Sequence, residues 1–180
     1  QVFSLGFGRD SGVGKVLKYF PDKSNKYMEV EPPYIKEQPR NLKITDEGVY
    51  FKSPIDGREI FIGPKESMRI QESLGADIIF AFDECTSPLS TKEYIKESLK
   101  RTHRWAKICL EGHYKGSPDA RSGRKEPSAL FGIVQGSHYE DLRKESAKFI
   151  NSLGFPGYGI GGDLGSSKKM MKDILKWTVP

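Results

Sequence analysis

At 180 residues the chain is long enough to bury a sizeable hydrophobic core, and one domain over residues 1–180 is expected. Hydrophobic residues make up 36% and charged residues 29%, as is ordinary for a soluble globular protein. No apolar run approaches the roughly 18 residues that span a bilayer, and the first residues do not resemble a signal peptide. A cytoplasmic protein without a membrane partner is therefore expected.

Two familiar kinds of site find little support. Cys85 and Cys109 are the two cysteines, and neither lies in a Cys-x-x-Cys or His-x-x-x-His pattern, so neither a disulfide framework nor a metal site is predicted. Gly12-Val13-Gly14-Lys15 lacks the earlier glycine of a phosphate-binding loop, and Val16 stands where Ser or Thr would bind magnesium. A flexible turn is the preferred interpretation there.

The charge is unevenly distributed along the chain. The net charge of +5 and an isoelectric point near 9.1 suit a polyanionic partner. The basic residues gather in one stretch, at Lys100, Arg101, Arg104, Lys107, Lys115, Arg121, Arg124 and Lys125. Such a cluster can bind phosphates through counterion release, and a solvated helix face followed by a mobile loop is the alternative.

The first predicted elements are a hairpin and a helix. Residues 1–48, rich in prolines and charges, indicate a long loop. A β-hairpin is predicted near residues 49–62, where two apolar runs flank the turn dipeptide Asp56-Gly57. A helix is then predicted from Pro64 to Gly75. Its inward residues should be Met68, Ile70 and Leu74.

From Ala76 the chain alternates short apolar runs with helical patterns, which is typical of parallel strands covered on both faces. Strands are predicted at residues 78–82, 130–134 and 157–160, and helices at 90–109, 138–153 and 166–177. The first of these helices should begin at a capping box of Ser90 and Glu93. The inward residues should be Ile95, Leu99, Thr102, Ala106 and Cys109, then Leu142, Ser146, Phe149, Ile150 and Leu153, then Met170, Ile174 and Trp177.

Each predicted parallel strand is followed by residues that suit a binding site: Asp83, Gln135 and Gly161-Gly162. Because ligands collect at the carboxyl edge of parallel strands, these residues are expected to form one pocket. Each also has a plainer interpretation, with Asp83 as a helix or turn cap, Gln135 as a loop anchor and the glycines as a tight turn.

Several segments in order resemble the tRNA-guanine transglycosylase (queuine tRNA-ribosyltransferase) family. They are Phe82 to Thr86, Leu130 to Gly136 and Gly157 to Gly162, with further matches at Gln1 to Leu5, Gly48 to Ser53 with Asp56-Gly57, Gln71 to Gly75 and Arg104 to Ala106. The resemblance implies an α/β fold of the (β/α)8 TIM barrel type, with the hairpin inserted. Such barrels need roughly 250 residues, so the chain is expected to form an incomplete middle portion.

The resemblance also implies a reaction. The family exchanges guanine at the tRNA wobble position for queuine or a 7-deazaguanine precursor, in queuosine modification, through attack of an aspartate on the ribose. By resemblance one catalytic aspartate precedes Gln1, and the other follows Pro180 together with a zinc site. No catalytic residue, metal or cofactor is therefore expected in this chain, and the implied partners are tRNA and a guanine-like base. A homodimer or a heterodimer would also fit.

Site roles follow from the same resemblance. Asp83 would accept hydrogen bonds from N1–H and the exocyclic amine of the base, while the Gln135 side chain and the Gly162 N–H would donate to O6; the chemistry of these groups agrees. Gly161 is a further candidate. Cys85 would either line the base site or be a small buried thiol.

Other polar residues receive structural interpretations. Glu84 is expected to make a structural hydrogen bond or ion pair, and His103, His113 and His138 to lie at the surface. Asp163 follows the glycine pair where bacterial members commonly have leucine. It would alter the choice of base or cap the helix near Ser166, and the cap is preferred.

Three alternatives stay open. The chain could belong to a non-catalytic subunit of the same family, or to a relative that modifies DNA with a deazapurine and differs in its choice of nucleic acid. The third alternative is an unrelated barrel enzyme that binds a small metabolite.

Overall fold

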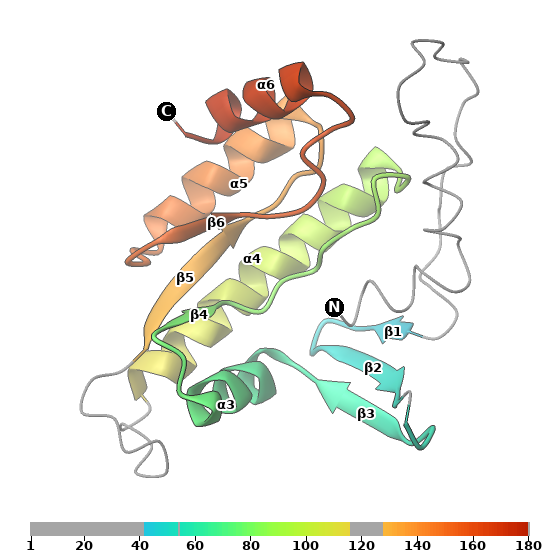
Figure 1. Cartoon of the computed structure of the whole chain (residues 1–180), viewed down its shortest axis with the longest axis vertical. Helices are drawn as coiled ribbons and strands as arrows, with labels where there is room; N and C mark the ends of the chain where they lie inside the picture. Colours follow the sequence, from blue (N-terminus) through green and yellow to red (C-terminus); the bar gives the residue numbers. More distant parts are fainter. Residues whose placement is uncertain (1–41, 54, 116–127, 180) are drawn as a thin grey trace.

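The computed structural model describes residues 42–53, 55–115 and 128–179 (Figure 1). Within these residues the chain first forms an antiparallel sheet and then alternates helices with parallel strands. The segment at residues 12–15 and most of the predicted N-terminal loop lie outside the described part. A mixed α/β architecture with a parallel sheet, as the sequence predicts, is present.

The antiparallel sheet contains the predicted hairpin strands. β2 (Val49–Lys52) pairs with β3 (Glu59–Ile62), and β1 (Leu42–Ile44) adds on the other side of β2. The prediction of a loop is wrong for β1, because a strand of three residues offers only two inward positions and leaves almost no periodic signal.

Helix α3 (Pro64–Leu74) has the predicted ends, with Pro64 in the first turn and Gly75 left-handed at φ 70°. Its predicted inward face is only partly right. Met68 is buried, whereas Ile70 and Leu74 are 43% and 77% exposed. At about 100° per residue, Ile70 lies about 200° and Leu74 about 240° around the helix from Met68, so the single face packed on α4 cannot include them.

The parallel sheet has the strand order β4-β5-β6, with β4 at Ile78–Phe80, β5 at Ala129–Val134 and β6 at Tyr158–Ile160. All three strands lie where the apolar runs predict them, although β4 ends two residues early. Three strands do not test whether the sheet closes, so the barrel stays a prediction.

The helices α4 (Lys92–Lys115), α5 (Glu140–Ser152) and α6 (Lys168–Thr178) follow the parallel strands (Figure 1). The predicted capping box is wrong: Thr91 Oγ1 accepts from the Tyr94 N–H at 3.3 Å, one residue later than Ser90. α4 also extends six residues beyond Cys109. Its predicted inward stripe is confirmed, since every member is buried.

The core lies between the parallel sheet and the helices that pack on it. Its main cluster consists of Met68, Ile79, Ala81, Ala106, Cys109, Leu130, Val134, Ile150 and Phe155. A second cluster joins the antiparallel sheet to α4 through Leu42, Ile44, Val49 and the fully buried Trp105. No helix in the described part of the chain is both long enough and apolar enough to cross a membrane.

Two of the predicted surface histidines are buried instead. His103 stacks on Phe149 with ring centroids 4.1 Å apart, and His113 Nδ1 lies 3.0 Å from Glu72 Oε1. The cause is the position of α4, which packs against α3 and α5 as well as the sheet. Burial, and then Lys107, lowers the pKa of His103 to about 4.

The depressed pKa of His103 predicts a pH dependence of stability. The neutral imidazole contributes fully above the ordinary pKa of about 6.5, and this contribution is lost as the pH falls toward about 4. His103→Gln should therefore lose less unfolding free energy than the parent between pH 7.5 and pH 5, as measured by urea unfolding at both pH values. Equal losses in the two proteins would contradict the shifted pKa.

Candidate functional site

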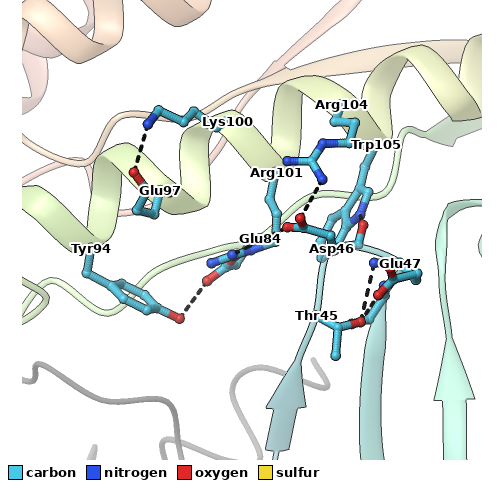
Figure 2. A network of polar contacts seen from close by, with 11 residues as sticks. Thr45, Asp46, Glu47, Glu84, Tyr94, Glu97, Lys100, Arg101, Arg104 and Trp105 are labelled. Atoms are coloured by element: carbon cyan, nitrogen blue, oxygen red, sulfur yellow. Dashed lines mark hydrogen bonds and ion pairs between the residues drawn. The ribbon is translucent and has the colours of Figure 1, made fainter.

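The loop after β4 carries two adjacent carboxylates with different surroundings. Glu84 is 1% exposed and accepts from Tyr94 Oη and Arg101 Nε, both at 2.7 Å (Figure 2). Its backbone N–H donates to Thr102 Oγ1 at 3.0 Å. The predicted structural role of Glu84 is confirmed. Because Glu84 is fastened to α4, the neighbouring Asp83 is held at a fixed place in the loop.

The same network joins α4 to the turn between β1 and β2. Arg104 Nη1 lies 2.7 Å from Asp46 Oδ2, and the Trp105 indole N–H donates to the Asp46 carbonyl at 2.7 Å (Figure 2). Arg101 and Arg104 of the predicted basic cluster thus face carboxylates within the protein, which favours a structural role at this end of the cluster. Arg121, Arg124 and Lys125 lie outside the described residues.

The loops after β4 and β5 meet through Asp83 and Gln135. The Gln135 side-chain amide donates from Nε2 to Asp83 Oδ2 at 2.5 Å. Gln135 is 3% exposed, and its backbone N–H donates to Ser146 Oγ of α5 at 3.2 Å. Two residues that are 52 positions apart in the sequence are therefore in direct contact, as the shared strand edge predicts.

The loop after β6 completes this arrangement. A Cβ at Gly161 would lie 2.7 Å from Gln135 Nε2, and one at Gly162 would overlap Gln135 Oε1. Gly162 also has a φ of 75°, which side chains strongly disfavour. Only glycine allows the backbone to approach the amide so closely. We call Asp83, Gln135, Gly161 and Gly162 the strand-end cluster.

Arg143 of α5, which the sequence analysis did not single out, holds two of these loops together. It is 0% exposed, and its guanidinium donates to four main-chain carbonyls, those of Val134, Ser137, Gly161 and Asp163, at 2.6 to 3.1 Å. A signal existed: Arg143 precedes the inward Ser146 and Ile150 by three and seven residues, which places it on the buried face.

Residues 31–180 match the family model described as queuine tRNA-ribosyltransferase. A relative from Archaeoglobus fulgidus is 49% identical across this whole chain, which covers 42% of that relative. Two proteins named queuine tRNA-ribosyltransferase, from Shouchella clausii and Macrococcus caseolyticus, are 45% and 48% identical over 77% of this chain, which covers 35% and 34% of them.

The chain belongs to the queuine tRNA-ribosyltransferase family. It spans less than half the length of these relatives. Its resemblance to the family, inferred from the ordered strand-end segments, is thereby confirmed. The roles that the resemblance assigns to individual residues in this family member stay predictions.

Two further candidate residues of this family member differ from their expected roles. Cys85 is exposed, so the prediction of a buried thiol is wrong. Neighbouring groups still partly shield the thiol from water, and this desolvation, followed by the Asp83 carboxylate, raises its pKa. Asp163 does not cap α6, because Ser167 Oγ accepts from the Met170 N–H at 3.1 Å; Asp163 Oδ1 instead accepts from the Gly165 N–H at 3.0 Å.

No group of three or more His, Cys, Asp or Glu side chains that could hold a metal ion occurs in the described residues. A cavity of about 920 Å³ is lined by residues of β5, β6, α5 and α6 and by Val179. Its lining combines apolar side chains with three lysines, Asn151 and Thr178. None of the predicted site residues belongs to it.

Two carboxylates that each pair with a cation of α4 should contribute differently to stability, because one pair is buried and the other is exposed. Glu84→Gln should cost about 1–3 kcal/mol of unfolding free energy, because it leaves charged and buried partners poorly satisfied. The matched control is Glu97→Gln, whose exposed pair with Lys100 should contribute little. Chemical denaturation of both variants measures the difference, and equal effects would show that Glu84 is not an anchor.

The raised pKa of Asp83 predicts a pH dependence of stability. Burial raises the pKa of its carboxyl despite the opposing hydrogen bond from Gln135. Ionisation of Asp83 therefore lowers the stability of the folded state as the pH rises above the ordinary aspartate pKa of 3.8. Asp83→Asn, which keeps the shape and the acceptor for Gln135, should melt at a higher temperature than the parent at pH 7.

The stabilisation by Asp83→Asn should shrink as the pH approaches 3.8. The exposed Glu145→Gln serves as the control for a change in net charge. Thermal melting at several pH values makes the measurement, and a destabilised Asp83→Asn at pH 7 would contradict the shifted pKa.

Proposed function

We propose that the strand-end cluster binds the pairing edge of a guanine-like base in a tRNA-guanine transglycosylase. The full reaction would replace guanine at the wobble position of tRNA with queuine or a 7-deazaguanine precursor. The observation that carries the proposal is the contact of Asp83 with Gln135 beside the backbone of Gly161 and Gly162. The family membership of the chain supports the same reaction class.

The order of groups in the cluster matches the order of groups on guanine. O6 is an acceptor, N1–H is a donor, and the two are attached to neighbouring ring atoms. A partner for this edge must therefore place a donor directly beside an acceptor, as the Gln135 amide and the Asp83 carboxylate do. The second N–H of the Gln135 amide would donate to O6 while the first stays on Asp83.

The exocyclic amine adds a third point of recognition. An ionised carboxylate accepts through two oxygens, so Asp83 can receive both N1–H and the amine while it holds Gln135. The Gly162 N–H would join Gln135 at O6. Adenine carries donors and acceptors in the opposite order along this edge, and the cluster would therefore reject it.

In this function the strand-end cluster recognises the base and takes no part in the chemical step. Covalent exchange at a ribose carbon needs a carboxylate nucleophile and a proton acceptor. Asp83 is not a candidate for the nucleophile, because a carboxylate that binds the base cannot also attack the ribose carbon. Glu84 is not a candidate either, since both of its oxygens accept structural hydrogen bonds.

The test is incorporation of labelled guanine into tRNA by the intact protein. The parent should incorporate the label, and Asp83→Ala should slow incorporation by about ten- to a hundredfold, because a hydrogen bond to a charged group is lost. Glu145→Ala, an exposed change on α5 that also removes one negative charge, is the control and should leave the rate unchanged.

Three outcomes would overturn parts of this proposal. Parental incorporation by a folded Asp83→Ala variant would exclude Asp83 from base recognition. Incorporation of the label into DNA rather than tRNA would identify a DNA-modifying relative. Absence of incorporation unless a second protein is added would identify a subunit that depends on an active partner.

A further inference from the structure

Arg143 is bound only by main-chain carbonyls among the contacts found in the described residues. Its Nε donates to the Ser137 carbonyl, Nη1 to those of Val134 and Gly161, and Nη2 to that of Asp163. Val134 and Ser137 flank Gln135, whereas Gly161 and Asp163 flank Gly162. One side chain therefore holds both sides of two cluster residues that lie on different loops.

The contact with Gly161 fixes the direction of the next amide group. A trans peptide unit is planar, and its C=O and N–H point in opposite directions. The Gly161 carbonyl accepts from Arg143 at 2.8 Å, and the Gly161 N–H donates to Val134 at 2.9 Å. The N–H of Gly162 is thus directed away from Arg143. Among the described residues, no acceptor for this N–H is found.

We propose that Arg143 is a positioning residue that sets selectivity for a purine with an oxygen at position 6. This inference rests on the proposed function and deepens it. Arg143 does not touch the base. It aims the Gly162 N–H at O6 and keeps the neighbouring Gln135 in register with Asp83, so that two donors converge on one acceptor.

A lysine could not replace this arrangement. Its ammonium is a compact group on a flexible stem, whereas the planar guanidinium presents five donors in a fixed pattern and engages four carbonyls here. Arg143→Lys keeps the positive charge but releases part of the two loops. This variant therefore separates the effect of the positive charge from the effect of the guanidinium geometry.

The experiment compares the affinities of three free bases for the intact protein. 6-Thioguanine keeps N1–H and the amine but offers a weaker acceptor at position 6, and hypoxanthine keeps O6 but lacks the amine. The parent should bind guanine more tightly than either, by about tenfold each. In Arg143→Lys the preference over 6-thioguanine should fall to within about threefold, while the preference over hypoxanthine should persist.

If Arg143 had a merely structural role, Arg143→Lys would lower the affinities for all three bases by the same factor, and that result would overturn the inference. Arg69→Lys, an exposed change on α3, is the matched control and should keep both preferences. If the parent shows neither preference, the proposed function itself fails and the inference falls with it. If the parent shows both and Arg143→Lys keeps both, only the inference fails.

Because Arg143 is fully buried, the variant must first show a cooperative melting transition. A measurement on the parent covers the case in which the variant does not fold. In nuclear magnetic resonance spectra, the Arg143 Nη protons should exchange slowly and couple through the hydrogen bond to the Gly161 carbonyl carbon. The Gly162 amide should shift on addition of guanine and less with 6-thioguanine. Rapidly exchanging Nη protons, or equal shifts, would overturn the inference.

Discussion

A positive charge without a carboxylate among its hydrogen-bond partners organises the carboxyl edge of the parallel sheet. Burial lowers the pKa of Arg143 to about 10, so the guanidinium still carries its charge at neutral pH. Removing such a group from water is costly unless its donors are satisfied, and four carbonyls accept from four of its five N–H groups. The two loops must keep these carbonyls converged, because any opening would strand a charge in the interior.

A second anchor works on the other side of the site through the opposite sign of charge. The Glu84 carboxylate is held by Arg101 and Tyr94, whose phenol keeps its proton because burial and then Glu84 raise its pKa. Helix α4 thus fixes the loop after β4 through Arg101, and helix α5 fixes the loops after β5 and β6 through Arg143. Asp83 and Gln135 lie between these anchors and bond to each other.

Periodicity predicted the parallel strands, the helices and the inward stripe of α4, because burial on a regular element leaves a repeating pattern. The convergence of Asp83, Gln135 and the glycine pair was predictable for the same reason, since strand ends share an edge. Arg143, His103 and β1 were missed. Helical spacing places Arg143 on the buried face, but it does not show which groups would satisfy the charge, because the four carbonyls come from loops whose path no local pattern specifies.

Arg143 engages carbonyl oxygens that every amino acid possesses. The side chains at positions 134, 137 and 163 can therefore change in related proteins without loosening the guanidinium. The path of the main chain around the site would stay the same among related proteins, while the side chains on it differ. Asp163 shows the two roles side by side: its carbonyl accepts from Arg143, and its carboxylate accepts from the Gly165 N–H.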